Sequence, residues 1–412
     1  MRDTGTEAGT APGKTEFVIM MAALMASNAL AIDAMLPALP AIGEALGVAE
    51  DNRRQLVITF YLLGFGAAQI AYGPLADRFG RRGLLIGSML LYALFGALAA
   101  AAASFTLLLA ARTMQGIAAA GTRVLVVAIV RDRFHGSAMA QIMSMVMIIF
   151  IVIPVLAPSI GQLVLAFATW RHIFVGLAGY GIMLAVWSAL RIPETLASEA
   201  RRPLSVASIT SAAAETLTTR ASIGNTVAAT LTFGALFAFI GSIQQIVFDV
   251  FERPGLLGLA FALIAAPMAG SSWLNSRLVM QVGSRRLLLT ALALFTLSTL
   301  LHLAVALAVG ETLWSFILLQ ALTMACFGLI GANAGALAMA PLGHIAGTAS
   351  SVQGLITTVG GALIGFVVGQ QFNGTTVPVV AGFALCGTLA LVVALWANPR
   401  PAAEPEVGLT QS

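Results

Sequence analysis

Long apolar segments recur along the whole chain, and they restrict its fold more than any other feature. About twelve segments hold roughly twenty or more residues each, enough for a helix rising about 1.5 Å per residue to cross a hydrocarbon core about 30 Å thick. They fall near 16–42, 53–76, 84–103, 106–130, 140–165, 172–192, 222–250, 254–281, 286–309, 313–340, 348–371 and 377–397. None shows the alternation of a membrane barrel strand. The sequence therefore predicts an all-α integral membrane protein with twelve transmembrane helices.

The basic residues gather on one side of this twelve-span arrangement. That side carries Arg2, Lys14, Arg78, Arg81, Arg82, Arg131, Arg133, Arg191, Arg201, Arg202, Arg220, Arg285, Arg286 and Arg400. The other side carries Arg53, Arg54, Arg171 and Arg253. Because positive residues favour the cytoplasmic side, we expect both termini in the cytoplasm. The positive charge thus follows topology and predicts no nucleic-acid partner.

One long polar segment divides the chain into two parts. Residues 193–221 interrupt the apolar pattern and are predicted to be a cytoplasmic linker between six-helix halves at 1–192 and 222–397. Residues 398–412 are predicted to be a cytoplasmic tail. The basic run Gly80-Arg81-Arg82 after the second span is echoed by Gly283-Ser284-Arg285-Arg286 after the eighth, which suggests duplication. Two such halves around a central cavity are typical of secondary transporters.

Residue types needed for metal or nucleotide chemistry are scarce. Cys326 and Cys386 lie within apolar segments, the four histidines show no metal-ligand spacing, and the sequence has no Gly-x-x-x-x-Gly-Lys phosphate loop. We therefore expect no metal, no cofactor and no ATP-driven pumping. The lack of a nucleophile, base and metal constellation argues against a membrane-embedded enzyme, which stays a less favoured alternative.

A polar cluster between the second and third spans is predicted to be a conformational latch. Its glycines permit close approach of helix ends, and Asp77 can face a helix N-terminus or pair with Arg78 or Arg81. The alternative is a simple topology anchor, which explains the arginines but not the glycines or the aspartate. The latch residues are Gly73, Asp77, Arg78, Gly80, Arg81 and Arg82.

Asp33 and Arg112 lie at comparable depths within the first and fourth spans. An unpaired ionised carboxylate in hydrocarbon costs several kcal/mol, so Asp33 needs a partner or a proton. A carboxylate that pairs with Arg112 or takes a proton has the equipment for proton coupling. The alternative is a static pair that fixes helix packing.

Arg123 follows Arg112 by eleven residues, so both should point to nearly the same face about 16 Å apart. A cavity position there could admit anionic or zwitterionic substrates or disfavour cations. Snorkelling toward the cytoplasmic surface is an equal alternative.

The fifth span combines residues that shape a helix with residues that adapt to ligands. Pro154 and Pro158 remove backbone donors and bend the helix, and Gly161 permits close packing, so we expect a gate between the halves. Met147 belongs to a methionine stripe that could line the cavity, although packing is the commoner role. The other candidates for a substrate cavity, each also able to make interhelical hydrogen bonds, are Asn28, Tyr61, Gln69, Gln115, Phe237, Gln244, Gln245, Asn333 and Gln353.

Several stretches together resemble a known family. The run Gly73-x-Leu75-Ala76-Asp77-Arg78-x-Gly80-Arg81-Arg82 is similar to the signature loop of the major facilitator superfamily. Arg112-Thr-Met-Gln115-Gly116 and Pro154-Val-Leu-Ala157-Pro158-Ser-Ile-Gly161 resemble its drug:proton antiporter branch. The likeness is greatest to the Bcr/CflA multidrug efflux type, through Ala31-Ile-Asp33-Ala-Met-Leu-Pro37, Val130-Arg131-Asp132, Trp170-Arg171 and Gly347-Thr-Ala-Ser350. Gln162 departs from the pattern, where a second glycine is usual.

This resemblance implies proton-coupled export of small amphiphilic compounds by alternating access across the inner (plasma) membrane. It also implies roles for Asp33 and Arg112 in proton coupling and substrate recognition. We expect a monomer whose partners are the substrate, protons and lipid. A proton symporter that imports a small nutrient is the alternative, and the fifth-span motif argues against it.

Overall fold

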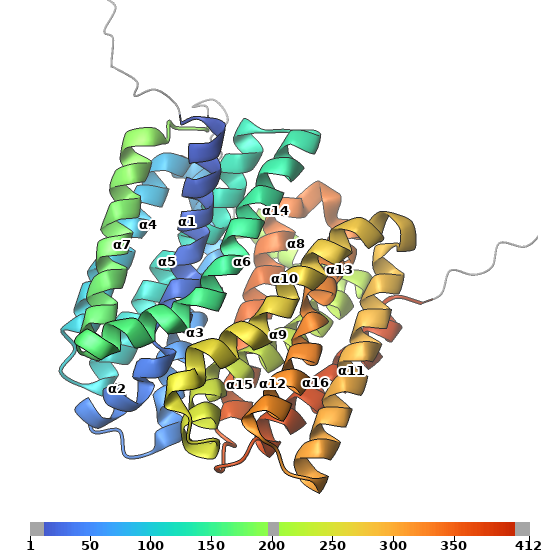
Figure 1. The fold of residues 1–412 in the computed structure, drawn as a ribbon. Helices are drawn as coiled ribbons and strands as arrows, with labels where there is room; N and C mark the ends of the chain where they lie inside the picture. The colour runs from blue at the N-terminus through green and yellow to red at the C-terminus, as the bar shows by residue number, and fades with distance from the viewer. Residues whose placement is uncertain (1–11, 197–205, 400–412) are drawn as a thin grey trace, which may run out of the picture.

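The computed structural model describes residues 12–196 and 206–399, and within these ranges the chain is helical, with no strand. Figure 1 shows two groups of helices side by side, the blue-to-green group and the yellow-to-red group. The first group contains α1 (Lys14–Asp33), η1 (Leu36–Ala38), α2 (Leu39–Ala45), η2 (Asp51–Gln55), α3 (Leu56–Phe79), α4 (Arg81–Ala100), α5 (Phe105–Arg133), α6 (Gly136–Phe167) and α7 (Trp170–Arg191). The second contains α8 (Val206–Thr218), α9 (Arg220–Gln245), η4 (Ile246–Val250), η5 (Pro254–Leu256), α10 (Leu257–Val282), α11 (Ser284–Ala308), α12 (Leu313–Ala325), α13 (Phe327–Met339), η6 (Ala340–Ile345), α14 (Ala346–Leu355), η7 (Ile356–Gly360), α15 (Gly361–Gly369) and α16 (Val377–Ala397).

Eleven segments of the described chain are long and apolar enough to cross a membrane. They are Lys14–Ala45, Asp51–Phe79, Arg81–Ala100, Phe105–Arg133, Gln141–Phe167, Trp170–Arg191, Arg220–Val250, Pro254–Val282, Ser284–Ala308, Leu313–Gly369 and Val377–Ala397. The predicted count of twelve is not reached by this measure, because Leu313–Gly369 counts as one apolar segment of 57 residues, although its backbone leaves helical geometry at one point. It contains a kink at η6, where Leu342 has φ −112° and ψ 23°.

Large apolar side chains cover the outward faces of these helices. Leu163, Leu297 and Leu385 are each more than three-fifths exposed, and Phe167 is 86% exposed. A contiguous apolar surface of this extent is unfavourable in water and favourable against lipid chains. The protein is therefore a multi-pass membrane protein.

The polar cluster, which resembles a family's signature loop in sequence, is mostly helical in the structure. Gly73, Asp77 and Arg78 belong to α3, and α4 begins at Arg81. Gly80 alone connects the two helices, with φ +93°, a conformation that glycine adopts without strain. Gly283 makes the equivalent turn between α10 and α11 with φ +83°, so the echo in sequence corresponds to an echo in backbone geometry.

The two groups of helices meet along two main seams. In one seam α3 packs against α14, η7 and α15, and in the other α6 packs against α10. We call the end of the molecule that holds η2, η4, η5 and residues 370–376 the η2 end; it is the lower end in Figure 1. The opposite end, which holds Gly80, Gly283 and η6, is called the Gly80 end.

Candidate functional site

Arg112 is fully buried in α5, with 0% of its side chain exposed. Its guanidinium donates to the carbonyl oxygens of Val57 at 3.2 Å and Ala31 at 2.9 Å, and to Gln115 Oε1 at 2.7 Å. It also lies 4.3 Å from the ring centroid of Tyr61. Three neutral oxygens and an aromatic face thus stabilise the buried charge, and they tie α5 to α1 and α3.

Asp33 ends α1 and is 4% exposed. Its Oδ1 has no hydrogen-bond partner among the described residues, and none of the described cations forms an ion pair with it. The structure therefore does not contain an ion pair between Asp33 and Arg112, because the Arg112 guanidinium donates to two backbone oxygens and to Gln115 instead. For a buried carboxyl group that no donor contacts, the protonated form is more stable than the ionised form.

The helix break beside Asp33 is packed against α6. A Cβ atom added at Gly161 would lie 1.9 Å from the carbonyl oxygen of Ala34 and 2.9 Å from Pro37 Cγ. Glycine is thus required here by close approach of two backbones. The helix α6 continues through both Pro154 and Pro158, so these prolines lie within the helix rather than ending it.

A short polar chain connects α1, α3 and α5 near this site. Asn28 Nδ2 donates to Thr122 Oγ1 at 3.0 Å, and the Tyr61 hydroxyl donates to Asn28 Oδ1 at 3.0 Å. The Tyr61 ring in turn lies against the Arg112 guanidinium. The predicted residues Asn28, Tyr61, Arg112 and Gln115 are therefore brought together, with Asp33 nearby along α1.

Arg123 has surroundings unlike those of Arg112. Its side chain is exposed. The residues that share this face of α5, Ala119, Val126 and Val130, are buried. No described residue donates to, accepts from or forms an ion pair with Arg123.

Most of the remaining predicted cavity residues have hydrogen-bond partners in other helices. Four of their side-chain amides donate hydrogen bonds: Gln69 to Thr358 at 3.1 Å, Gln245 to Asn52 at 2.8 Å, Asn333 to Asn275 at 2.6 Å and Gln353 to Ser222 at 3.1 Å. Gln244 is buried and its Nε2 lacks a partner within the described structure. Met147 packs against the hydrophobic core.

A cluster of amides at the η2 end was not predicted from the sequence as a group. Gln55 Nε2 donates to Gln245 Oε1 at 2.5 Å and to the Gly369 carbonyl at 3.3 Å. Asn52 donates to the carbonyls of Gln370 and Phe372 at 3.1 and 3.0 Å. Amides at span ends are the available sequence signal, but it does not identify their partners. These bonds join the two helix groups at the η2 end.

Gln162 adds a further connection across the α6–α10 seam. It donates to the Pro254 carbonyl at 2.9 Å and accepts from the Gly258 amide at 3.2 Å. The residue that departs from the family pattern thus connects α6 to the start of α10.

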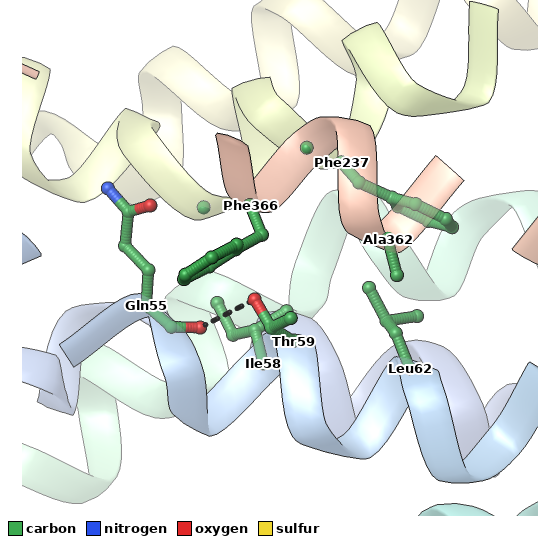
Figure 2. Close-up of a pocket in the computed structure, with 9 residues that line it drawn as sticks. Gln55, Ile58, Thr59, Leu62, Phe237, Ala362 and Phe366 are labelled. Atoms are coloured by element: carbon green, nitrogen blue, oxygen red, sulfur yellow. Dashed lines mark hydrogen bonds between the residues drawn. The ribbon is translucent and has the colours of Figure 1, made fainter. Parts of the chain in front are cut away.

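Figure 2 shows the space beside the amide cluster, lined by residues of α3, α9 and α15. Phe237, one of the predicted cavity residues, faces Leu62 and Ala362 there. The cavity has a volume of about 10 Å³, which is room for about one water molecule. The seam between α3 and α15 is therefore tightly closed at this level.

The latch residues at the Gly80 end form an ion-pair network. Asp77 Oδ1 lies 2.7 Å from Arg81 Nη1, and Arg81 Nε lies 3.2 Å from Asp132 Oδ2. Glu194 accepts from the backbone amide of Arg81 at 2.8 Å, so it is Glu194 that caps the start of α4. Of the two predicted partners of Asp77, the structure selects Arg81; the Arg78 guanidinium instead lies 5.2 Å from the Phe79 ring centroid, and Arg82 donates to the Ala189 carbonyl at 2.6 Å.

A buried titratable pair lies in the other helix group. His302 Nε2 lies 2.7 Å from Glu311 Oε1, and Thr376 donates to the other carboxylate oxygen. The sequence did not identify this pair. Within residues 12–196 and 206–399, no group of three or more His, Cys, Asp or Glu side chains could hold a metal ion.

The helical fold, the apolar exterior and the buried charges define a multi-pass membrane protein with polar chemistry inside its helix groups. The sequence matches the model of the Major Facilitator Superfamily over residues 21–364, and the chain belongs to that family. The expected resemblance to this superfamily is thereby confirmed.

Two relatives extend over nearly the whole chain. The uncharacterized MFS-type transporter YdgK of Bacillus subtilis is 31% identical over 380 residues, covering 91% of this chain and 93% of its own. The bicyclomycin resistance protein homolog of Haemophilus influenzae is 28% identical over 386 residues, covering 93% and 96%. These relatives are consistent with the Bcr/CflA-type likeness.

Two solved structures share the fold at low sequence identity. The human organic anion transporter MFSD10 (TETRAN) has a TM-score of 0.67 and 19% identity, and covers 94% of this chain and 100% of that one. A D-xylose-proton symporter has a TM-score of 0.67 and 13% identity, covering 92% and 97%. Since the two resemble this chain equally in fold, the fold alone does not determine the direction or the substrate of transport.

Proposed function

We propose that this protein exports small amphiphilic compounds in exchange for protons. The proposal is based on the burial of Asp33, whose carboxyl group lies at the break of α1 without a hydrogen-bond donor. Such a group is stable when protonated and must gain water or a partner to release its proton. The relative whose name refers to bicyclomycin resistance supports export over import.

The proposed architecture has twelve spans in two six-helix halves, 1–192 and 222–397, joined by a linker at 193–221. In it the 57-residue segment Leu313–Gly369 crosses twice, because one straight helix of that length would extend about 85 Å, far more than a bilayer requires. The Gly80 end faces the cytoplasm of the cell, and the membrane is the inner one. Residues 400–412 of the tail lie outside the described residues. We assign a monomeric state and no catalytic activity or cofactor.

In the proposed cycle the two halves rock about the site, and the structure corresponds to the state closed at the η2 end. The hydrogen bonds that the side-chain amides of Asn52 and Gln55 donate across the two helix groups support this assignment. Asp33 takes a proton from the outer side and releases it on the inner side as substrate binds. Arg112 positions the break of α1 through the Ala31 carbonyl rather than neutralising Asp33 directly.

The latch residues around Asp77 act in the opposite state, which is closed at the Gly80 end. Asp77 is 47% exposed while it pairs with Arg81, which leaves its carboxylate free to engage the second half when the Gly80 end closes. The close approach of Gly73 to Ser351 of α14, with 3.6 Å from the added Cβ to Oγ, supports contact along this seam. We therefore propose that the cluster stabilises the outward-facing state.

Transport driven by a pH gradient in inside-out membrane vesicles tests the proposal. The variant Asp33→Asn should abolish pH-driven uptake of amphiphilic drugs while the protein remains folded. A matched control is Asp249→Asn, which removes a carboxylate near the η2 end of α9. Normal coupling in Asp33→Asn would refute the assignment of the proton carrier.

A further inference from the structure

We propose that Arg123 is the anion-recognising group of the transport site, so that the preferred substrates are amphiphiles with one anionic group such as a sulfonate or carboxylate. This inference rests on the proposed function and names the substrate class. It follows from where Arg123 lies, what surrounds it and which charges remain uncompensated.

The position of Arg123 is internal rather than superficial. Three buried residues, Ala119, Val126 and Val130, share its face of α5, while the Arg123 side chain itself is accessible. Arg123 also precedes the last residue of α5 by ten residues, about 15 Å along the axis, too far for snorkelling to the Gly80 end. This combination indicates the wall of a water-accessible space inside the protein.

The charge of Arg123 has no counter-charge within the described structure. Glu16 pairs with Arg191 at 2.5 Å, and Asp77 and Asp132 pair with Arg81. Asp33 is neutral while it carries its proton, so it adds no negative charge in that state. An anion in the site would therefore neutralise Arg123, whereas a neutral ligand would leave its charge unpaired and a cation would add repulsion.

Arg112, the other arginine on this face, is not available to a ligand. It is completely buried and its donors already bond to two carbonyls and Gln115. One turn beyond Arg123, Val127 is exposed. An apolar side chain thus lies next to the charge, which suits an amphiphile with a charged head.

Two probes that share a scaffold and differ in charge test this inference. The sulfonate 1-anilinonaphthalene-8-sulfonate is anionic, and N-phenyl-1-naphthylamine is its neutral counterpart. Their binding to the purified, detergent-solubilised protein is measured by equilibrium dialysis for wild type, Arg123→Gln and Arg123→Lys. The matched control is Arg277→Gln, which removes an arginine that stacks over Trp273 on α10.

In wild type and Arg277→Gln the anionic probe should bind more tightly than the neutral one. Arg123→Gln should reduce this preference about tenfold or more, and Arg123→Lys should retain part of it because the charge remains. An equal preference in wild type and Arg123→Gln, or a wild type without preference, would overturn the inference.

Transport of the same probes separates this inference from the proposed function. Anion preference in binding without pH-driven transport of either probe in vesicles would refute the exchange mechanism and leave the role of Arg123 supported. Transport of both probes with no effect of Arg123→Gln would refute the role of Arg123 alone.

Discussion

The contact between α6 and the break of α1 gives the most quantitative prediction, through the variant Gly161→Ala. The added methyl group would lie 1.9 Å from the Ala34 carbonyl oxygen, whereas ordinary contact begins at 3.4 Å. The two backbones would have to separate by about 1.5 Å. Overpacking of this kind costs about 1–3 kcal/mol, offset in part by the better helix propensity of alanine. Because the overlap is large, the cost lies near the upper end, about 3 kcal/mol, and the gain in helix propensity is about 1 kcal/mol, so we expect a net loss of about 2 kcal/mol, or roughly thirtyfold in an equilibrium constant.

The separation should also affect coupling, because Ala34 directly follows Asp33. Displacing the break of α1 gives water access to a carboxyl group that is 4% exposed, so we expect proton leakage without substrate. A matched control is Gly179→Ala on α7, where an added Cβ meets nothing within 4 Å.

Two assays measure these effects. Reaction of a thiol-specific dye with the buried residues Cys326 and Cys386 reports thermal unfolding, and a pH-sensitive dye in proteoliposomes reports leakage. Gly161→Ala should unfold at lower temperature than Gly179→Ala and leak protons. Identical unfolding temperatures and proton leakage in the two variants would show that close contact at Gly161 does not hold the break of α1 in place.

Three further variants test separate parts of the account. Asp77→Asn should slow turnover in vesicles more than it weakens substrate binding, because the carboxylate acts between states; unaltered turnover would exclude the latch. Gln55→Leu removes two bonds that close the η2 end, at about 0.5–1.5 kcal/mol each, so amides of residues 369–372 should exchange hydrogen faster; unchanged exchange would contradict a closing role. Arg112→Lys should lower the free energy of unfolding by about 3 kcal/mol because buried carbonyls lose their donors; an unshifted melting temperature would count against it.

The membrane character of the fold was predictable because it depends on local composition. Each apolar segment can be recognised from its length. The count of twelve spans was not reproduced, because Leu313–Gly369 forms one apolar segment that is interrupted only by the kink at η6.

Side-chain partners were predicted less well because they depend on how helices rotate against one another. Asp33 and Arg112 lie at comparable depth, yet the guanidinium turns toward the carbonyls of Ala31 and Val57. Gln69 and Gln353, proposed for one cavity, bond to separate partners. A single sequence gives the depth of such residues from their position in a span, but it does not give their neighbours.

Proton release on substrate binding is the most direct test of whether Asp33 carries the exchanged proton. Candidate drugs are added to purified detergent-solubilised wild type and Asp33→Asn in weakly buffered solution, and proton release is recorded with a pH-sensitive dye. We predict that wild type releases protons and Asp33→Asn releases none, while both proteins bind the drug. Binding without release in wild type, or equal release from the two proteins, would contradict it.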